Sequence, residues 1–172
     1  MLWRRVRIGA FTLLVLLGAA LFLVRLPFLL VGGVSGSPAL CLPLNGAEHF
    51  SLYYIHSVHR SPVWENFSPG PGDVLVLTST VYDSLGVGIP FLSGEGSLVN
   101  EGGRFRLTGL HRQFSEINLM VMPGAGQALV HRGRTYSVEG YFGPGSLIRL
   151  RIERCSPGEV IWNRLRQWGG SH

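Results

Sequence analysis

Residues 55–65 hold the densest group of side chains that could do chemistry. They include His56, Ser57 and Glu65, and they read as two short strands joined by a turn. If residues 59–62 form a four-residue hairpin loop, His56 lies directly opposite Glu65 on the neighbouring strand. A carboxylate beside an imidazole fixes the orientation and the tautomer of the ring. Such a pair would suit a general base, or part of a site for an anion or a metal ion.

The same pair also has a purely structural interpretation. Side chains alternate along a strand, so one face of the predicted hairpin is mostly apolar. That face would carry Tyr54, His56, Val58, Val63, Glu65 and Phe67. A histidine and a glutamate that satisfy each other on such a face would hold the hairpin together without binding anything else. Both interpretations stay open from the sequence.

No complete catalytic or metal-binding pattern surrounds this hairpin. His56 and His59 are three residues apart, which places them on opposite faces of a strand, and no second cluster of metal ligands follows. Ser57 lacks the Gly-x-Ser-x-Gly turn that exposes a nucleophilic serine. We therefore expect a protein that is not an enzyme, with no catalytic residues, no metal ion and no cofactor.

A second candidate site is the glycine-rich segment of residues 84–90. Its candidate residues are Ser84, Gly86, Gly88 and Pro90. They predict a tight turn, because glycine adopts positive φ angles without a steric penalty. Backbone amides in such a turn can bind an anion, although a plain turn is the simpler interpretation. The segment is not a dinucleotide-binding loop, since the third glycine and the βαβ context are missing.

Short strands must position these residues. The chain has 24 glycines and 10 prolines, so turns are frequent and a helix bundle is a poor fit. Strand-like segments occur at residues 50–58, 63–67, 74–78, 105–107, 117–122, 128–131, 135–138 and 147–152. We therefore expect an all-β fold, a single small β-sandwich or barrel over residues 35–156.

Residues 1–34 predict a transmembrane anchor. Residues 8–24 form an uncharged apolar run that three arginines precede, and the apolar character continues to residue 31. At about 1.5 Å per residue, the run reaches the lower limit for crossing a bilayer. Arginines before the span predict an N-terminus in the cytoplasm and a body outside it. A secretory signal, cleaved near the small residues 34–39, is the alternative.

The net charge of +5 does not indicate nucleic-acid binding. Residues 1–30 hold four arginines and no acidic residue, so the rest of the chain has 11 arginines against 10 acidic residues. A nearly neutral body offers no basic surface along which a phosphate backbone could bind. The basic excess belongs to the predicted anchor.

Residues 157–172 predict an amphipathic helix and a tail. Ser156 and Glu159 have the spacing of a capping box at the helix start. One face of the helix would carry Ile161, Leu165 and Trp168. That face would pack on the β body, or it would lie at the membrane interface or against a membrane partner.

Two cysteines, Cys41 and Cys155, bracket the predicted β body. In an oxidising compartment they could form a disulfide. Because the closed loop would be long, such a bond would stabilise the fold by roughly 4–5 kcal/mol. Two separate buried thiols are the alternative interpretation.

The chain resembles a bacterial family known as domain of unknown function 1850. The resemblance rests on residues 54–58, 62–65 and 84–90, and it extends over about residues 40–155. The family usually has an alanine between the two glycines of the last segment, where this chain has Val87. The larger side chain narrows any site there.

The resemblance implies a role in transport rather than a reaction. Similar proteins look like small membrane-anchored extracytoplasmic proteins, and their genes often lie beside those of TAXI-type tripartite ATP-independent periplasmic (TRAP) transporters. This implies an accessory subunit of a secondary transporter for organic anions, anchored in the bacterial inner membrane with its body in the periplasm. The expected partners are the permease, the periplasmic solute-binding protein and the lipid bilayer. The alternative is a stand-alone periplasmic module that binds a small ligand between His56, Glu65 and residues 86–90.

Overall fold

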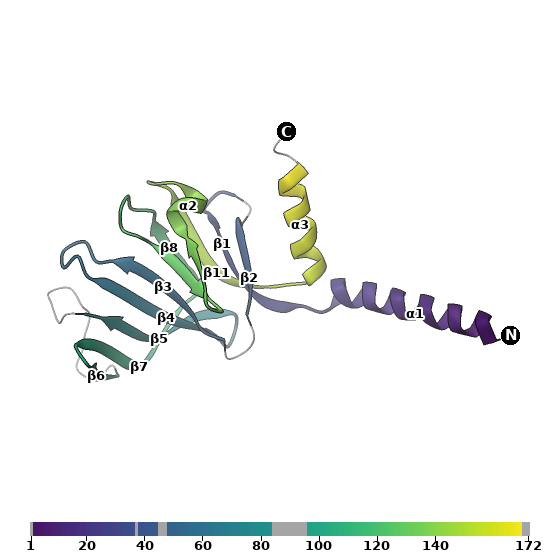
Figure 1. Cartoon of the computed structure of the whole chain (residues 1–172), viewed down its shortest axis with the longest axis horizontal. Helices are drawn as coiled ribbons and strands as arrows, with labels where there is room; N and C mark the ends of the chain where they lie inside the picture. The colour runs from purple at the N-terminus through teal and green to yellow at the C-terminus, as the bar shows by residue number, and fades with distance from the viewer. Residues whose placement is uncertain (1, 37, 45–47, 84–95, 170–172) are drawn as a thin grey trace.

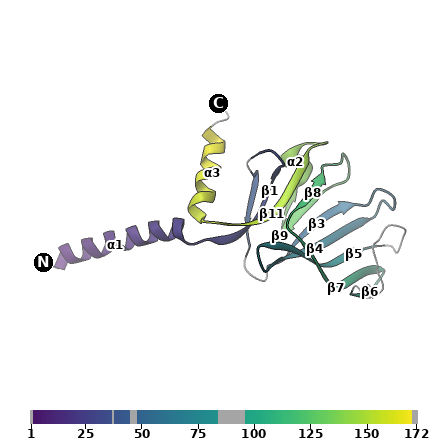
Figure 2. The ribbon, with the colours of Figure 1, turned by 180° about the vertical axis from the view of Figure 1, so that it is seen from behind.

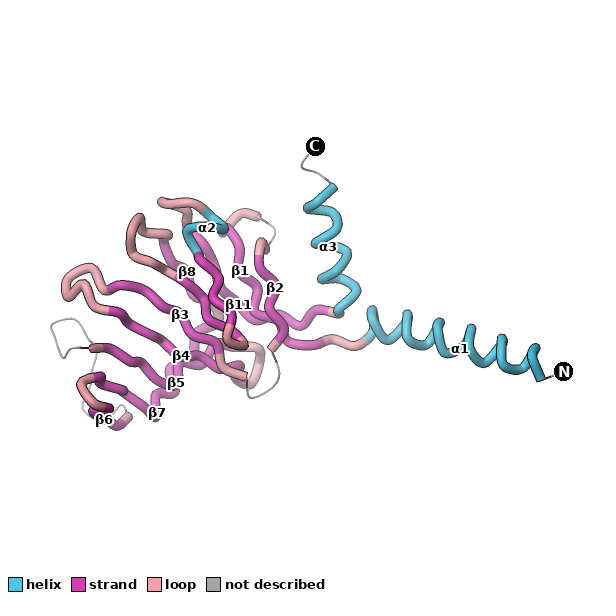
Figure 3. Tube along the Cα trace, viewed as in Figure 1, coloured by secondary structure: helices cyan, strands magenta, loops and turns pink. Residues whose placement is uncertain are grey.

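Two antiparallel sheets form the body of the molecule, and a helix extends from the body at each end of the chain (Figure 1). The structure is a computed structural model that describes residues 2–36, 38–44, 48–83 and 96–169. Strands dominate the body, as Figure 3 shows. The predicted all-β fold with an N-terminal apolar helix and a short C-terminal helix is confirmed, and the architecture is a sandwich of two sheets.

The strands follow one another in space in a fixed order. The four-stranded sheet runs β2 (Leu40–Pro43), β1 (Leu26–Gly33), β11 (Leu147–Cys155) and β8 (Ile117–Met120). The seven-stranded sheet runs β10 (Arg134–Ser137), β9 (Ala128–His131), β3 (Phe50–Ile55), β4 (Pro62–Gly70), β5 (Val74–Tyr82), β7 (Arg104–Phe114) and β6 (Ser97–Glu101). The helices are α1 (Leu2–Leu23), α2 (Val138–Phe142) and α3 (Pro157–Gly169).

The core lies between the sheets and comes from alternating apolar residues. In β11, Ile148, Leu150 and Ile152 are buried, whereas the arginines between them are only half-buried. These residues belong to one cluster with Phe50 and Phe67 of the other sheet, whose rings stack with centroids 5.4 Å apart. The two-residue period therefore separates a core face from a solvent face, as the strand patterns predict.

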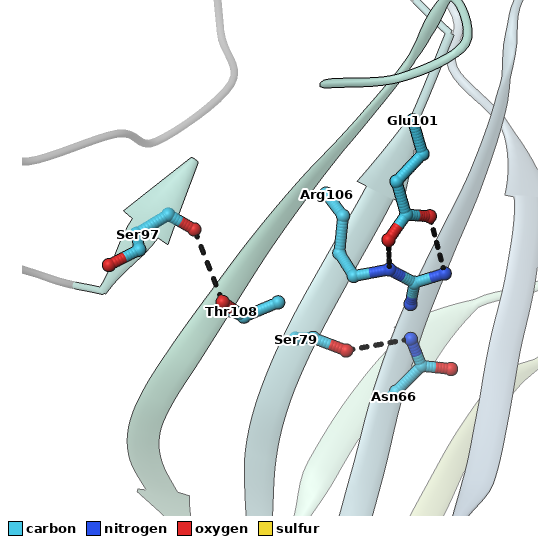
Figure 4. A network of polar contacts seen from close by, with 6 residues as sticks. All are labelled: Asn66, Ser79, Ser97, Glu101, Arg106 and Thr108. Atoms are coloured by element: carbon cyan, nitrogen blue, oxygen red, sulfur yellow. Dashed lines mark hydrogen bonds and ion pairs between the residues drawn. The ribbon is translucent and has the colours of Figure 1, made fainter. Parts of the chain in front are cut away.

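The outer face of the seven-stranded sheet carries a row of small polar side chains (Figure 4). Residues of five neighbouring strands lie opposite one another in this row: Ser51, Asn66, Ser79, Thr108 and Ser97. The Ser51 hydroxyl donates to Asn66 Oδ1 at 2.6 Å, and the Asn66 amide donates to Ser79 Oγ at 2.9 Å. Cross-strand hydrogen bonds of this kind stabilise a sheet. They give the polar residues that alternate with the core residues a structural role on the outer face.

The N-terminal helix is shorter than the predicted anchor of residues 1–34. α1 ends at Leu23, and its segment Val6–Leu23 is long and apolar enough to cross a membrane, with no part of it buried. Residues 26–33 instead form β1, which pairs with β2 on one side and with β11 on the other. The predicted boundary at residue 34 is therefore wrong. A continuous apolar run is typical both of a membrane helix and of a fully buried strand, and Pro27 disfavours helical backbone at Leu26.

The C-terminal helix begins where the sequence predicts. The Ser156 N–H donates to Glu159 Oε2 at 2.8 Å, and the Glu159 N–H donates to Ser156 Oγ at 3.2 Å. This reciprocal pair is the predicted capping box, and it satisfies two backbone donors at the helix start. From there α3 extends away from the sheets, which Figure 2 shows from behind.

Ser156→Ala is expected to loosen α3 without unfolding the sandwich. The substitution removes the oxygen that accepts the Glu159 N–H, and losing an N-cap costs about 1 kcal/mol. Hydrogen exchange of the α3 amides should become severalfold faster, while the amides of β3 and β4 keep their rates. Ser115→Ala, at an exposed bend, is the control that should change neither. Unchanged exchange in α3 would show that the capping box does not hold the helix.

The predicted disulfide between Cys41 and Cys155 is not formed. Cys41 lies opposite Leu30 and Cys155 lies opposite Leu26, so β1 separates the two strands that carry them. With about 4.8 Å between strands and about 3.3 Å per residue along them, the Cα atoms lie more than about 10 Å apart. A disulfide needs Cα atoms within about 7 Å. Both residues are half-buried thiols, and burial raises the pKa of Cys155.

Candidate functional site

The hairpin of β3 and β4 positions the candidate residues with a different register from the predicted one. Glu65 lies opposite Leu52, and residues 56–61 form the loop. The predicted direct pair of His56 and Glu65 is therefore wrong, because the loop has six residues rather than four. The register moves by an even number of residues, so Tyr54, Val63 and Glu65 stay on their predicted face. Val58, which was predicted on the same face, instead lies in the loop and is exposed.

Glu65 has Tyr54 as its partner. The Tyr54 hydroxyl donates a hydrogen bond to Glu65 Oε1 at 3.2 Å, diagonally across the two strands. Both side chains line a cavity of about 90 Å³ on the inner face of the seven-stranded sheet. The other polar residues of its lining are His56, Thr80, Tyr82 and Arg112. The rest of the lining is apolar, and an apolar cavity with a few converging polar groups is the usual form of a ligand site.

The pairing of three strands explains why these side chains converge. Glu65 of β4 lies opposite Thr80 of β5, and Tyr82 follows two residues later on the same face. In β7 the register shifts around Gly109, whose φ of 74° is left-handed. Such a bulge changes the direction of the side chains beside it, and Arg112 lines the cavity from the strand beyond it.

Glu65 is a carboxylic acid held where its charge is unfavourable. Burial raises its pKa above the ordinary value of 4.5, while the hydrogen bond from Tyr54 and the charge of Arg112 act in the opposite direction. Burial and the nearby Glu65 also raise the pKa of Tyr54. Ionisable groups with shifted pKa values in a cavity mark candidate functional sites.

Tyr82 gives the strongest indication of a binding site. Its side chain is 1% exposed and lines the cavity. Its hydroxyl has no hydrogen-bond partner among the residues that the structure describes. An unsatisfied buried hydroxyl destabilises a fold by about 1–3 kcal/mol. Burial raises the pKa of Tyr82, so the hydroxyl stays protonated. It can therefore donate a hydrogen bond to an acceptor on a ligand.

Tyr82→Phe is expected to leave the melting temperature of the purified chain unchanged or to raise it. The substitution removes a buried hydroxyl that has no partner among the described residues, and it keeps the ring that fills the core. Tyr54→Phe is the matched control, because it removes a hydroxyl that donates to Glu65 and should lower the melting temperature. An equally large decrease for Tyr82→Phe would show that its hydroxyl is satisfied in the fold.

His56 lines the cavity, whereas Ser57 does not. His56 Nδ1 accepts the backbone N–H groups of Val58 and His59 at 3.3 and 3.4 Å, so the ring helps to order the loop. Ser57 is exposed and borders a more open hollow of about 630 Å³, which Tyr54 and His56 also line. The structure therefore brings His56 and Glu65 to one cavity without pairing them, and it places Ser57 outside that cavity.

Four predicted site residues, Ser84, Gly86, Gly88 and Pro90, lie outside the described residues. Among residues 2–36, 38–44, 48–83 and 96–169, no group of three or more His, Cys, Asp or Glu side chains could hold a metal ion.

The sequence interpretation missed Thr80, Tyr82 and Arg112. It ended the strand of β5 at residue 78 and the strand of β7 at residue 107, whereas the strands continue to Tyr82 and Phe114. The β-branched and aromatic residues after residue 78 are the signal that could have extended β5. Apart from Gly109, the sequence has no comparable signal for the bulge that places Arg112.

Comparison with known proteins identifies a family but no relative. The family model described as Domain of unknown function (DUF1850) matches residues 50–138, just over half of the chain. No curated protein and no solved structure matches the chain. The matched range begins with β3 and includes every residue of the lining of the cavity. The chain therefore belongs to the DUF1850 family.

Proposed function

We propose that this chain is a membrane-anchored accessory subunit of a TAXI-type TRAP transporter for organic anions. In this proposal α1 crosses the bacterial inner membrane once, and the sandwich lies in the periplasm against the permease. The choice of this transporter rests on the resemblance of residues 54–58, 62–65 and 84–90 to a family whose genes often lie beside those of such transporters. The proposal assigns no reaction and no cofactor to the chain.

The short connection between the span and the sandwich carries the proposal. α1 ends at Leu23 and β1 begins at Leu26, so only Val24 and Arg25 separate them. Two residues extend at most about 7 Å. A domain held this close to the bilayer is suited to a partner in the same membrane, and a permease is such a partner.

The distribution of arginines supports the orientation. Arg4, Arg5 and Arg7 precede the apolar segment, whereas Arg25 alone follows it closely. Positively charged residues beside a span favour the cytoplasmic side. The sandwich, which follows the span, is thereby directed to the periplasm.

The experiment is an affinity purification in mild detergent. The tagged full chain would be produced with a TAXI-type permease and its solute-binding protein, and the permease recovered with it would be quantified. We expect near-stoichiometric recovery. Replacing Val6–Leu23 by an unrelated membrane span is the control that separates recognition by α1 from recognition by the sandwich. If neither the full chain nor the chain with the replaced span recovers any permease, the proposal is refuted.

The cavity favours a second candidate function, a stand-alone module that binds a small ligand. Tyr82 and Arg112 can donate hydrogen bonds to an anionic or carbonyl oxygen, and about 90 Å³ accommodates only a few non-hydrogen atoms. Small carboxylates such as formate and acetate are the probes. A module of this kind would bind them in the absence of a permease, and Tyr82→Phe would abolish the resulting thermal stabilisation.

A further inference from the structure

Helix α3 exposes large apolar side chains. Ile161 is 54% exposed, Trp162 is 55% exposed and Leu165 is 60% exposed. Spaced three and four residues apart, Ile161 and Leu165 lie on the same side of the helix as Gly158. An exposed apolar side on an amphipathic helix indicates a surface that binds an apolar partner.

The same side of α3 faces the end of α1. A Cβ atom added at Gly158 would lie 2.6 Å from Cε1 of the Phe22 ring, so glycine permits this close approach. One and two turns further along α3, Ile161 and Leu165 continue the surface that begins at Gly158. The apolar side of α3 is therefore continuous with the last turn of the apolar helix.

The opposite side of α3 faces the sandwich across a hollow. Val160 and Asn163 line this space of about 550 Å³ together with residues of β2. Of the two alternatives for the apolar face of α3, packing on the β body is thus wrong for Ile161 and Leu165, because the other side of the helix faces the body.

The start of α3 lies at the level where the apolar helix ends. Phe22 contacts Gly158, and Arg25 forms an ion pair with Glu159 at 3.6 Å. Figures 1 and 2 show α3 running across the direction of α1 rather than alongside it. If α1 crosses the bilayer, this arrangement places α3 along the membrane surface with its apolar side toward the lipid.

We propose that α3 lies in the membrane–water interface as an amphipathic helix, with Ile161 and Leu165 in contact with lipid. Tryptophan favours this interface, which suits the exposed Trp162. The inference rests on the proposed membrane anchor. With α1 and α3 both bound to the bilayer, the sandwich cannot rotate freely about α1 and presents one fixed side to its surroundings.

The test measures spin-label accessibility in the full chain, reconstituted in vesicles of phosphatidylethanolamine and phosphatidylglycerol. Cys41 and Cys155 are replaced by serine, and single cysteines are introduced by Ile161→Cys and Leu165→Cys. Asn163→Cys, on the side that faces the sandwich, is the matched control. We expect the ratio of oxygen to nickel-chelate collisions to be severalfold higher at positions 161 and 165 than at 163.

Leu16→Cys in the middle of α1 separates failure of this inference from failure of the anchor. A label there that reports water would refute the anchor itself. A label there that reports hydrocarbon, with water at positions 161 and 165, would refute the interfacial helix. Low accessibility to both reagents at 161 and 165 would show a protein contact, which also overturns the proposal.

A second measurement needs no change to the cysteines. Lipids brominated near the interface should quench the tryptophan fluorescence of the wild-type chain in the same vesicles. Trp162→Phe is expected to reduce the fluorescence intensity that the lipids quench, whereas Trp64→Phe, in β4 of the sandwich, is expected to leave this intensity unchanged. An unaltered quenched signal in Trp162→Phe would contradict the interfacial position of α3.

Discussion

A chain that begins at Ser35 is expected to be unfolded, whereas a chain that begins at Arg25 is expected to fold. The shorter chain lacks β1, the strand that joins β2 to β11 in the four-stranded sheet. In β1, Leu29 and Val31 are 0% exposed. Four apolar side chains of β1, those of Phe28, Leu29, Leu30 and Val31, are buried. At about 1.5–3 kcal/mol each they contribute about 6–12 kcal/mol, which is comparable to the ~5–15 kcal/mol that stabilises a typical domain.

Thermal unfolding followed by circular dichroism measures this difference. The chain from Arg25 is the matched control, because it lacks the same apolar helix but keeps β1. Cooperative unfolding of the Ser35 chain at the temperature of the control would show that β1 is dispensable. The expected result favours a retained anchor, since cleavage of a secretory signal between residues 34 and 41 would remove a core strand from the mature protein.

Glu65→Gln is expected to stabilise the protein at neutral pH and to flatten its pH dependence. Burial raises the pKa of Glu65, so the folded state holds this proton more tightly than the unfolded state. Its contribution to stability is therefore greatest at acidic pH and decreases as the pH rises through the raised pKa. Glutamine cannot ionise, and its carbonyl oxygen still accepts the Tyr54 hydroxyl.

Glu65→Ala should behave in the opposite way. It leaves the Tyr54 hydroxyl without the acceptor that it now has at 3.2 Å, which costs about 1–3 kcal/mol, and it enlarges the cavity. Free energies of unfolding from urea titrations between pH 4 and pH 8 would distinguish the variants.

Glu101→Gln controls for the sign of the pH effect. The hydrogen bond from Arg106 lowers the pKa of Glu101. The contribution of Glu101 to the free energy of unfolding therefore decreases as the pH falls through this lowered pKa, which is opposite in direction to the effect of Glu65. A pH dependence in Glu65→Gln that equals the wild-type dependence would show that Glu65 ionises as it does in water.

Much of the fold could be predicted from local patterns. The strands from β3 to β5 show the alternation typical of strands, a Gly–Pro turn at residues 70–72 separates β4 from β5, and Ser156 with Glu159 defines the start of α3. β1 could not be predicted, because a strand that is buried on both faces has the same continuous apolar run as a membrane helix. β6 is exposed along its whole length, and its two apolar residues, Leu98 and Val99, are adjacent rather than alternating, so the sequence shows no pattern of a half-buried strand there.

The candidate site was predictable only in part: His56 and Glu65 were found, whereas Thr80, Tyr82 and Arg112 were not. Both residues line one cavity, although His56 belongs to the loop after β3, where strand alternation does not fix the direction of a side chain. The register depends on the length of the loop, and the His56 ring, the positive φ of Arg60 and the Arg60 N–H bond to the His56 carbonyl together build a six-residue loop. Neither spacing nor composition specifies that loop.

The mature N-terminus of the protein tests the central claim most directly, because both the anchor and the accessory role depend on an uncleaved α1. The full-length chain would be produced in a Gram-negative bacterium, extracted from the membrane in detergent and weighed intact by mass spectrometry. We predict a mass that includes residues 3–34, with the chain beginning at Met1 or Leu2. A mature chain whose first residue lies between Ser35 and Cys41 would contradict the account, since it would have lost both the membrane helix and the β1 strand.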